Sequence, residues 1–252
     1  VGLKKSALII FGQMSMRANI LVAVNNTIKQ YLLDEGLPEK KIKVVENGID
    51  NSFFNSAGDG KKRRHQFGIP SDAVVIVFVG SFQPFHRVDL LLHAFKRIST
   101  KKKTHLLLIG QGNSTNDAKM IAEELGLTNR VTFTGRVPYQ DVASYASVGD
   151  IAVMPATNEY TNPMKVYEYM ALGKAIVAPN QNNIREIIIH NQTALLFERE
   201  NVGALSSALN TLVEDGSLRE RISSQAGRFA AEHTWQKRAA VFQQVFHEAG
   251  LV

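Results

Sequence analysis

From Val74 onward, short apolar runs alternate with longer segments in which apolar residues recur every three or four positions. The runs are continuous, as in Val74–Val79, which is typical of strands that are buried on both faces of a parallel sheet. The segments between them have the apolar stripe of helices that cover such a sheet. The pattern therefore predicts an α/β fold with a doubly wound, Rossmann-type parallel sheet.

The same pattern predicts the bounds of the individual elements. The predicted strands are Val74–Val79, Leu106–Ile109, Val131–Thr134, Ile151–Met154, Ala175–Ala178 and Ala194–Phe197. The predicted helices are His86–Ser99, Asp117–Leu125, Gln140–Ala146, Pro163–Gly173, Val202–Val213, Leu218–Glu232 and Gln236–Ala249. Ligands of such sheets bind beyond the carboxyl ends of the strands. Because the loops at Gly80, Gly110, Gly135 and residues 155–162 follow those ends, we expect a ligand site among them.

Residues 1–50 have a different pattern. A helix over Leu3–Met16, a strand over Ile20–Val24 and a helix over Thr27–Gly36 precede the segment Lys43–Val45. A single α-β-α unit buries its own faces poorly, so we interpret this region as the tail end of another domain. Residues 51–72 are polar and are predicted to form a connecting loop.

The segment from Asn162 to Ala178 combines a capped helix with a buried strand. Asn162 is predicted as the N-cap and Pro163 as the first helical residue. Lys165 and Glu168 are three residues apart and share one face of this half-buried helix. Free N–H groups of the first turn, together with Lys165, suit a phosphate, and Glu168 suits sugar hydroxyls. The alternative interpretation is a solvated Lys–Glu pair on an ordinary amphipathic helix.

Composition narrows the function classes. With 252 residues, 44% of them hydrophobic, the chain can bury a core for one large domain, or for one domain with an appendage. The absence of cysteine excludes disulfides and thiolate chemistry. The seven histidines lack the His-Glu-x-x-His spacing of a zinc site, and no apolar run reaches the ~20 residues of a membrane span. Because the chain begins at Val1 rather than Met, we expect it to be part of a longer protein.

The net charge is +6, with basic runs at residues 61–64 and 101–103. Such runs suit nucleic acid, anionic lipid or a phosphorylated substrate, but they are more often solvated loops. Neither run has interleaved aromatic residues, which argues against a module that binds single-stranded nucleic acid. The sequence also lacks a full dinucleotide fingerprint, a Walker-type loop and a Gly-x-Ser-x-Gly elbow.

Several short sequence motifs occur along the chain in an order that indicates a known family. They are Val44–Asp50, Phe78–Phe82 with His86 and Asp89–Leu91, Leu108–Gly112, Val131–Val137, Lys165–Lys174 and His233–Trp235. In this order and at this spacing they resemble the C-terminal, donor-binding domain of retaining glycosyltransferases of the GT-B fold, family 4 or "group 1". The resemblance covers nearly the whole chain and does not extend to the nucleotide base, the sugar or the acceptor.

The resemblance implies a site for a nucleotide-diphosphate sugar. Glu168 would hold the ribose hydroxyls, the Gly80–Arg87 loop and Lys165 the diphosphate, and Gly110 with Arg136–Val137 the base. The implied donor-nucleotide residues are Gly80, Ser81, His86, Arg87, Gly110, Arg136, Val137, Lys165 and Glu168. Glu159, Asn162 and Met164 are further candidates for contact with the donor sugar or phosphate. No residue is assigned as catalytic, and no metal ion and no cofactor besides the donor is expected.

The resemblance also implies a division of the chain. Residues 1–50 would be the tail end of an acceptor-type N-terminal domain, 51–72 a linker, 73–234 the donor domain and 235–252 a crossing helix. The rest of the acceptor domain would belong to a missing N-terminal part or a partner chain. We therefore expect the isolated chain to be inactive or weakly active. We further expect a role in polysaccharide biosynthesis and a cytoplasmic location, peripheral at the inner membrane face. We also expect an acceptor at a membrane surface and no nucleic acid partner.

The chain departs from the family pattern at two places, of which the second keeps another function open. The family has a glutamate eight residues before Glu168, where this chain has Tyr160, with Glu159 one position away. The family also has basic residues where this chain has Ser81 and His86-Arg87. The alternative is therefore a non-catalytic nucleotide-binding subunit or pseudoenzyme that needs a separate acceptor-domain chain. A basic module that binds nucleic acid rests on charge alone.

Overall fold

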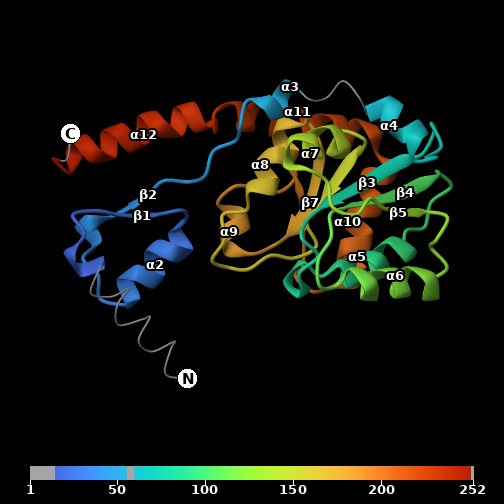
Figure 1. The fold of residues 1–252 in the computed structure, drawn as a ribbon, viewed down its shortest axis with the longest axis horizontal. Helices are drawn as coiled ribbons and strands as arrows, with labels where there is room; N and C mark the ends of the chain where they lie inside the picture. Colours follow the sequence, from blue (N-terminus) through green and yellow to red (C-terminus); the bar gives the residue numbers. More distant parts are fainter. Residues whose placement is uncertain (1–14, 56–59, 251–252) are drawn as a thin grey trace.

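The computed structural model describes residues 15–55 and 60–250. Its larger sheet has six strands in the order β5-β4-β3-β6-β7-β8, all parallel (Figure 1). The strands are β3 (Val74–Val79), β4 (Thr104–Ile109), β5 (Val131–Phe133), β6 (Ile151–Val153), β7 (Ala175–Pro179) and β8 (Leu195–Phe197). Each coincides with a predicted apolar run, and the predicted doubly wound α/β fold is confirmed.

The order in which strands are added to the sheet reverses between β3 and β6, while all strands stay parallel. It builds outward from β3 through β4 to β5, then returns to pair β6 with β3 through Ile76–Ile151 and Val77–Ala152. In parallel sheets of this type a crevice opens beyond the carboxyl ends of the strands at the reversal. The loop after β3 lies at this position, and the loop after β4 follows the strand next to it.

Helices cover both faces of the sheet and explain why its strands are continuously apolar. One face packs against α5 (Val88–Lys96), α6 (Thr115–Glu124) and α10 (Val202–Glu214). The other packs against α7 (Tyr139–Ala146), α8 (Met164–Ala171), α9 (Asn182–Arg185) and much of α11 (Gly216–Ala231) (Figure 1). The four central residues of β3, Val75–Phe78, are fully buried between these two cores.

Residues 51–72, predicted as a loop, contain two helices. These are α3 (Ser52–Asn55) and α4 (Gly60–Gln66). Phe53 of α3 is buried in the core that includes α8. In α4, Arg64 donates to the Val148 carbonyl at 2.7 Å and pairs with Asp150 at 2.8 Å. The prediction was wrong because tertiary anchoring, which the polar local sequence does not show, stabilises these short helices.

The prediction that Asn162 caps a helix was also wrong. Helix α8 begins at Met164, and Pro163 occupies the N-cap position without a side-chain capping bond. The Asn162 carbonyl instead accepts a bond from Nδ2 of Asn47 at 2.8 Å, and its Oδ1 accepts the Asn47 backbone N–H at 3.4 Å. Asn162 is buried, and it forms these hydrogen bonds to Asn47 of the crossing segment instead of capping the helix, because buried polar groups must be paired.

The described part of the N-terminal region is a small separate layer. Strands β1 (Leu21–Ala23) and β2 (Ile42–Val44) pair in parallel, with α2 (Asn26–Asp34) between them and the short turn η1 (Glu39–Lys41) before β2. Its core consists of Ala23, Leu32, Leu37 and Ile42, with a few partly buried neighbours. The predicted helix Leu3–Met16 lies outside the described residues, apart from its last two positions.

The chain crosses between these parts twice, at adjacent positions. Ile49 donates its N–H to the His233 carbonyl at 2.8 Å and accepts the Trp235 N–H at 3.1 Å. A Cβ on Gly48 would lie 2.8 Å from the Trp235 nitrogen, so only glycine fits this crossing. Helix α12 (Trp235–Glu248) then runs back to the N-terminal layer, where Glu248 pairs with Lys43 at 3.3 Å (Figure 1). Among the helices described, none is long and apolar enough to cross a membrane.

Candidate functional site

Two glycine loops are pressed together at the carboxyl ends of β3 and β4. A Cβ on Gly110 would lie 1.9 Å from the carbonyl oxygen of Gly80, and one on Gly112 would lie 1.6 Å from that of Ser81. Gly110 also has a φ of +120°, which other residues rarely adopt, and donates its N–H to the Gly135 carbonyl at 3.0 Å. Backbone, rather than side chains, therefore forms this wall of the site.

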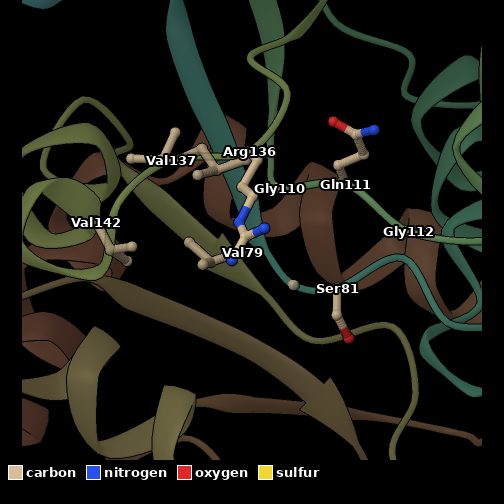
Figure 2. Close-up of a pocket in the computed structure, with 10 residues that line it drawn as sticks. Val79, Ser81, Gly110, Gln111, Gly112, Arg136, Val137 and Val142 are labelled. Carbon is tan, nitrogen blue, oxygen red and sulfur yellow. The ribbon is translucent and has the colours of Figure 1, made fainter.

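A cavity of about 550 Å³ opens beside these loops (Figure 2). Its lining is Val79, Gly80, Ser81, Ile109, Gly110, Gln111, Gly112, Arg136, Val137 and Val142. Five residues singled out from the sequence thus lie together: Gly80, Ser81, Gly110, Arg136 and Val137. Figure 2 shows the Arg136 side chain extending into the cavity.

The sequence argument missed the other lining residues. Gln111 and Gly112 follow directly after a predicted strand, so their position in a loop of this kind was a usable signal. Val142 comes from the first turns of α7, which only the folded chain brings to the cavity.

Lys165 lies one residue inside α8, with its ammonium against the Gly80 loop. Nζ of Lys165 is 4.8 Å from the centre of the Phe78 ring. A Cβ on Gly80 would lie 3.2 Å from the same Nζ. Burial lowers the pKa of Lys165 to about 8, and the Glu168 carboxylate opposes that shift. Among the described residues no carboxylate oxygen lies within 4.0 Å of Nζ. The site therefore holds a half-buried cation with no ion-pair partner in the described part of the chain.

His86 is the neighbour of Lys165 on the loop side. It ends the 3₁₀ turn η3 (Pro84–His86), is buried, and places Nε2 at 3.5 Å from Nζ of Lys165. Burial and the charge of Lys165 lower the pKa of His86 to about 4. The predicted helix His86–Ser99 begins at Val88 instead, because Arg87 has a φ of +48° and breaks the helical path.

Glu168 lies one turn further along α8. Burial raises the pKa of its carboxyl, and Lys165 and the hydroxyl of Tyr139 act in the opposite direction. Tyr139 itself is 66% exposed at the start of α7. Because Glu168 is only 9% exposed and makes no salt bridge with Lys165 among the described residues, the solvated Lys–Glu pair does not describe this helix.

A hydrogen bond ties α8 to the end of the central strand. The Val79 N–H donates to the hydroxyl of Tyr169 at 2.8 Å, at a position where the β3–β6 pairing has already ended. Tyr169 is fully buried, so its hydroxyl is fixed. This bond holds the helix that carries Lys165 and Glu168 at a set position relative to the Gly80 loop.

The remaining predicted residues lie elsewhere or play other structural parts. Arg87 forms a two-pronged ion pair with Asp89, with contacts of 2.9 to 3.1 Å, and lines a different cavity. Glu159 pairs with Arg199 and lines a third cavity. Asn162 serves the crossing segment, as described above, and Met164 is the half-buried first residue of α8.

No cluster of potential metal ligands is found in the part of the chain that the structure describes. Within residues 15–55 and 60–250, no group of three or more His, Cys, Asp or Glu side chains is placed to hold a metal ion. The expectation that no metal takes part stays a prediction.

Comparison with known proteins settles the family. Residues 59–229 match the family model of glycosyl transferases group 1. The chain belongs to this family. It is 26% identical over 222 residues to a D-inositol 3-phosphate glycosyltransferase of Thermobispora bispora. This match covers 84% of this chain and 51% of the relative. It is 23% identical to an uncharacterized glycosyltransferase of Methanocaldococcus jannaschii, over 91% of this chain and 58% of the relative.

Solved structures share the fold. HepE of Anabaena, in a complex with UDP and glucose, superposes with a TM-score of 0.85 at 21% identity, over 98% of this chain and 67% of that one. The C-terminal domain of a group 1 glycosyl transferase, LpcC of Francisella tularensis, gives a TM-score of 0.65 at 20% identity, over 73% of this chain and 97% of that one. The chain spans about half the length of the curated relatives it matches.

Proposed function

We propose that this chain binds the nucleotide-diphosphate sugar donor of a glycosyltransferase. The observation that carries the proposal is the half-buried side chain of Lys165, whose ammonium lies against the Gly80 loop without a carboxylate partner among the described residues. A diphosphate would supply the missing negative charge. The N-terminal N–H groups of α8 and the neighbouring cavity of about 550 Å³ offer further donors and room for the nucleoside.

The parts of the donor follow from this placement. The diphosphate would lie between the Gly80 loop and Lys165, with Ser81 at the cavity wall. Glu168 would accept bonds from the ribose hydroxyls, and the base would lie near Gly110 and Val137. The buried, partly desolvated setting of Glu168 strengthens such hydrogen bonds relative to those at an exposed surface.

The reaction would be retaining transfer of the sugar to an acceptor. Lys165 and the N-terminus of α8 would stabilise the departing nucleoside diphosphate without a metal ion. Acceptor groups would come from an N-terminal domain, of which residues 1–50 are the tail end. The structure of HepE in a complex with UDP-glucose supports a hexose donor. An acceptor at a membrane surface, polysaccharide synthesis and a cytoplasmic location belong to the same proposal.

One observation favours a second function, that of a non-catalytic nucleotide-binding subunit. Ser81 stands at the cavity wall where the family has a basic residue, and Arg87 is engaged by Asp89. Fewer cations then remain to stabilise a leaving group. Turnover of a labelled nucleotide sugar, measured after an N-terminal half is added, distinguishes the transferase from the non-catalytic subunit. A non-catalytic subunit would bind the donor and not transfer its sugar.

A thermal-shift panel tests donor binding. UDP, GDP, ADP and their monophosphates are added to the protein with and without EDTA. A ligand that binds only the native state raises the melting temperature by mass action. We expect one diphosphate to give a larger shift than its monophosphate, unchanged by EDTA. Equal shifts for both would remove the diphosphate site, and a shift lost in EDTA would contradict metal-free binding.

A further inference from the structure

The histidine beside Lys165 contacts that lysine and does not line the cavity. His86 is 9% exposed, and its Nε2 lies 3.5 Å from Nζ of Lys165. Its other ring nitrogen, Nδ1, is buried and has no hydrogen-bond partner among the described residues. Because unpaired buried polar atoms are costly, the retention of a histidine here calls for a reason.

The surroundings keep this imidazole neutral. A doubly protonated ring would direct one N–H at the Lys165 ammonium and leave the other, at Nδ1, without an acceptor among the described residues. The pKa of His86, lowered to about 4, agrees with this geometry. An ammonium has only donors, so the contact is a bond from Lys165 to a lone pair on Nε2.

The imidazole ring also contacts two aromatic side chains. The Phe85 ring lies 4.4 Å from that of His86 between centroids, and the Phe78 ring lies 5.8 Å away. Phe78 also lies under the Lys165 ammonium at 4.8 Å. Histidine and lysine therefore share one aromatic wall, which limits the positions that Nζ can take.

We propose that His86 is a positioning residue that fixes the Lys165 ammonium at the Gly80 loop for a diphosphate. This inference rests on the proposed function, since it requires a nucleoside diphosphate to bind there. A neutral acceptor orients the ammonium without neutralising it, whereas a carboxylate at the same place would compete with the phosphate. The cation is thus held in position while its charge is left for the ligand.

Proton uptake on binding follows from this arrangement. The titratable groups that face Lys165 are His86 from η3 and Glu168 from its own helix, and Tyr139 lies beyond Glu168. Because burial lowers the pKa of Lys165 to about 8, a fraction of the Lys165 side chains is neutral at a pH near 8. A bound diphosphate favours the charged form. Binding should then take up a fraction of a proton at pH 8, where the phosphates themselves are ionised.

Titration calorimetry of three variants tests the positioning role. UDP, GDP and ADP, each with its monophosphate, are titrated into wild type, His86→Leu and His86→Gln, with the exposed His93→Leu as the matched control. Glutamine can offer an oxygen to Lys165 and leucine cannot. We expect about tenfold weaker diphosphate binding in His86→Leu, with the loss reduced to about threefold or less in His86→Gln. Monophosphate binding and the His93→Leu variant should be unchanged.

Equal losses for leucine and glutamine, or equal losses for diphosphate and monophosphate, would overturn the positioning role and indicate a packing role. Thermal melts of each variant without ligand show whether the fold persists, and His86→Gln covers the case in which His86→Leu does not fold.

Repeating the wild-type titration at pH 8 in buffers of different ionisation enthalpy measures the proton uptake. An uptake that is present in wild type and absent in Lys165→Arg supports the inference, and no uptake in wild type contradicts it. If wild type binds no nucleoside diphosphate at all, the proposed function fails. If it binds normally and His86→Leu does too, only the present inference fails.

Discussion

At the scale of single residues, the candidate site depends on two charged side chains of α8, Lys165 and Glu168, that are half-buried and buried and form no salt bridge among the described residues. Lys165 and Glu168 could be singled out from their spacing on a helix that also carries Val166 and Met170. Their environment could not be predicted, because burial, the Phe78 ring and the contact with His86 all arise from tertiary packing. A charge kept in such a place costs stability unless a ligand compensates it.

Replacing Lys165 should reveal this cost. Its pKa is lowered to about 8 in the folded protein from 10.5, so the unfolded chain binds more protons between these values. The free energy of unfolding therefore rises as the pH increases from about 8 to 10.5, and the full penalty is present below pH 8. We expect Lys165→Met to be more stable than wild type at pH 7, by on the order of 2 kcal/mol, with the difference shrinking at pH 10.

Urea denaturation at pH 7 and pH 10 measures this difference. Lys96→Met, at an exposed position on α5, is the control and should show no pH-dependent change relative to wild type. A Lys165→Met protein that is less stable than wild type at pH 7 would show that the ammonium stabilises the fold.

Replacing Glu168 tests its proposed contact with the ribose hydroxyls. Removing a charge-assisted hydrogen bond costs about 1.5–3 kcal/mol, so Glu168→Gln and Glu168→Ala should weaken nucleoside diphosphate binding roughly 10- to 100-fold. Wild type and variants should bind the 2′,3′-dideoxy nucleotide with similar affinity, because the hydroxyls are absent from it. The exposed Glu123→Gln serves as control. A variant that melts earlier but binds the nucleotide unchanged would make Glu168 a structural residue.

At the scale of elements, continuous apolar runs predicted every strand of the large sheet, because burial on both faces leaves few polar positions in a strand; Thr104 and His105 of β4 and Thr132 of β5 are exceptions. The predictions failed where a contact distant in sequence decides local structure. Asn162 bonds to Asn47 instead of capping α8, and Arg64 anchors a helix in a segment that reads as a loop. Likewise, the start of α5 is set by the left-handed Arg87, which no apolar period indicates.

The pressed glycine loops give a prediction at this scale. Gly112→Ala would place a Cβ 1.6 Å from the backbone oxygen of Ser81, so the loops after β3 and β4 must separate. We expect a loss of about 2–5 kcal/mol in unfolding free energy and weaker nucleotide binding. In Gly216→Ala the nearest neighbour would be 3.6 Å away, so that control should stay within about 1 kcal/mol of wild type. Equal stability of the two variants in urea melts would refute the close contact.

At the scale of the whole molecule, the described chain joins a complete parallel sheet to a small N-terminal layer through two adjacent crossings. Gly48 passes against Trp235, and α12 returns to Lys43 (Figure 1). The layer also touches the main body where Glu186 accepts the Asn26 N–H at 2.8 Å. The site loops belong wholly to the large sheet and its helices, so donor binding should not depend on further domains, whereas transfer to an acceptor should.

The ratio of diphosphate to monophosphate affinity, measured by titration calorimetry, tests the proposed diphosphate site most directly. For whichever of UDP, GDP and ADP binds best, we expect wild type to bind the diphosphate about tenfold or more tightly than its monophosphate. Lys165→Met should bring that ratio close to one, while Lys96→Met leaves it unchanged. A wild-type ratio near one, or a ratio that persists in Lys165→Met, would contradict a diphosphate site built on this lysine.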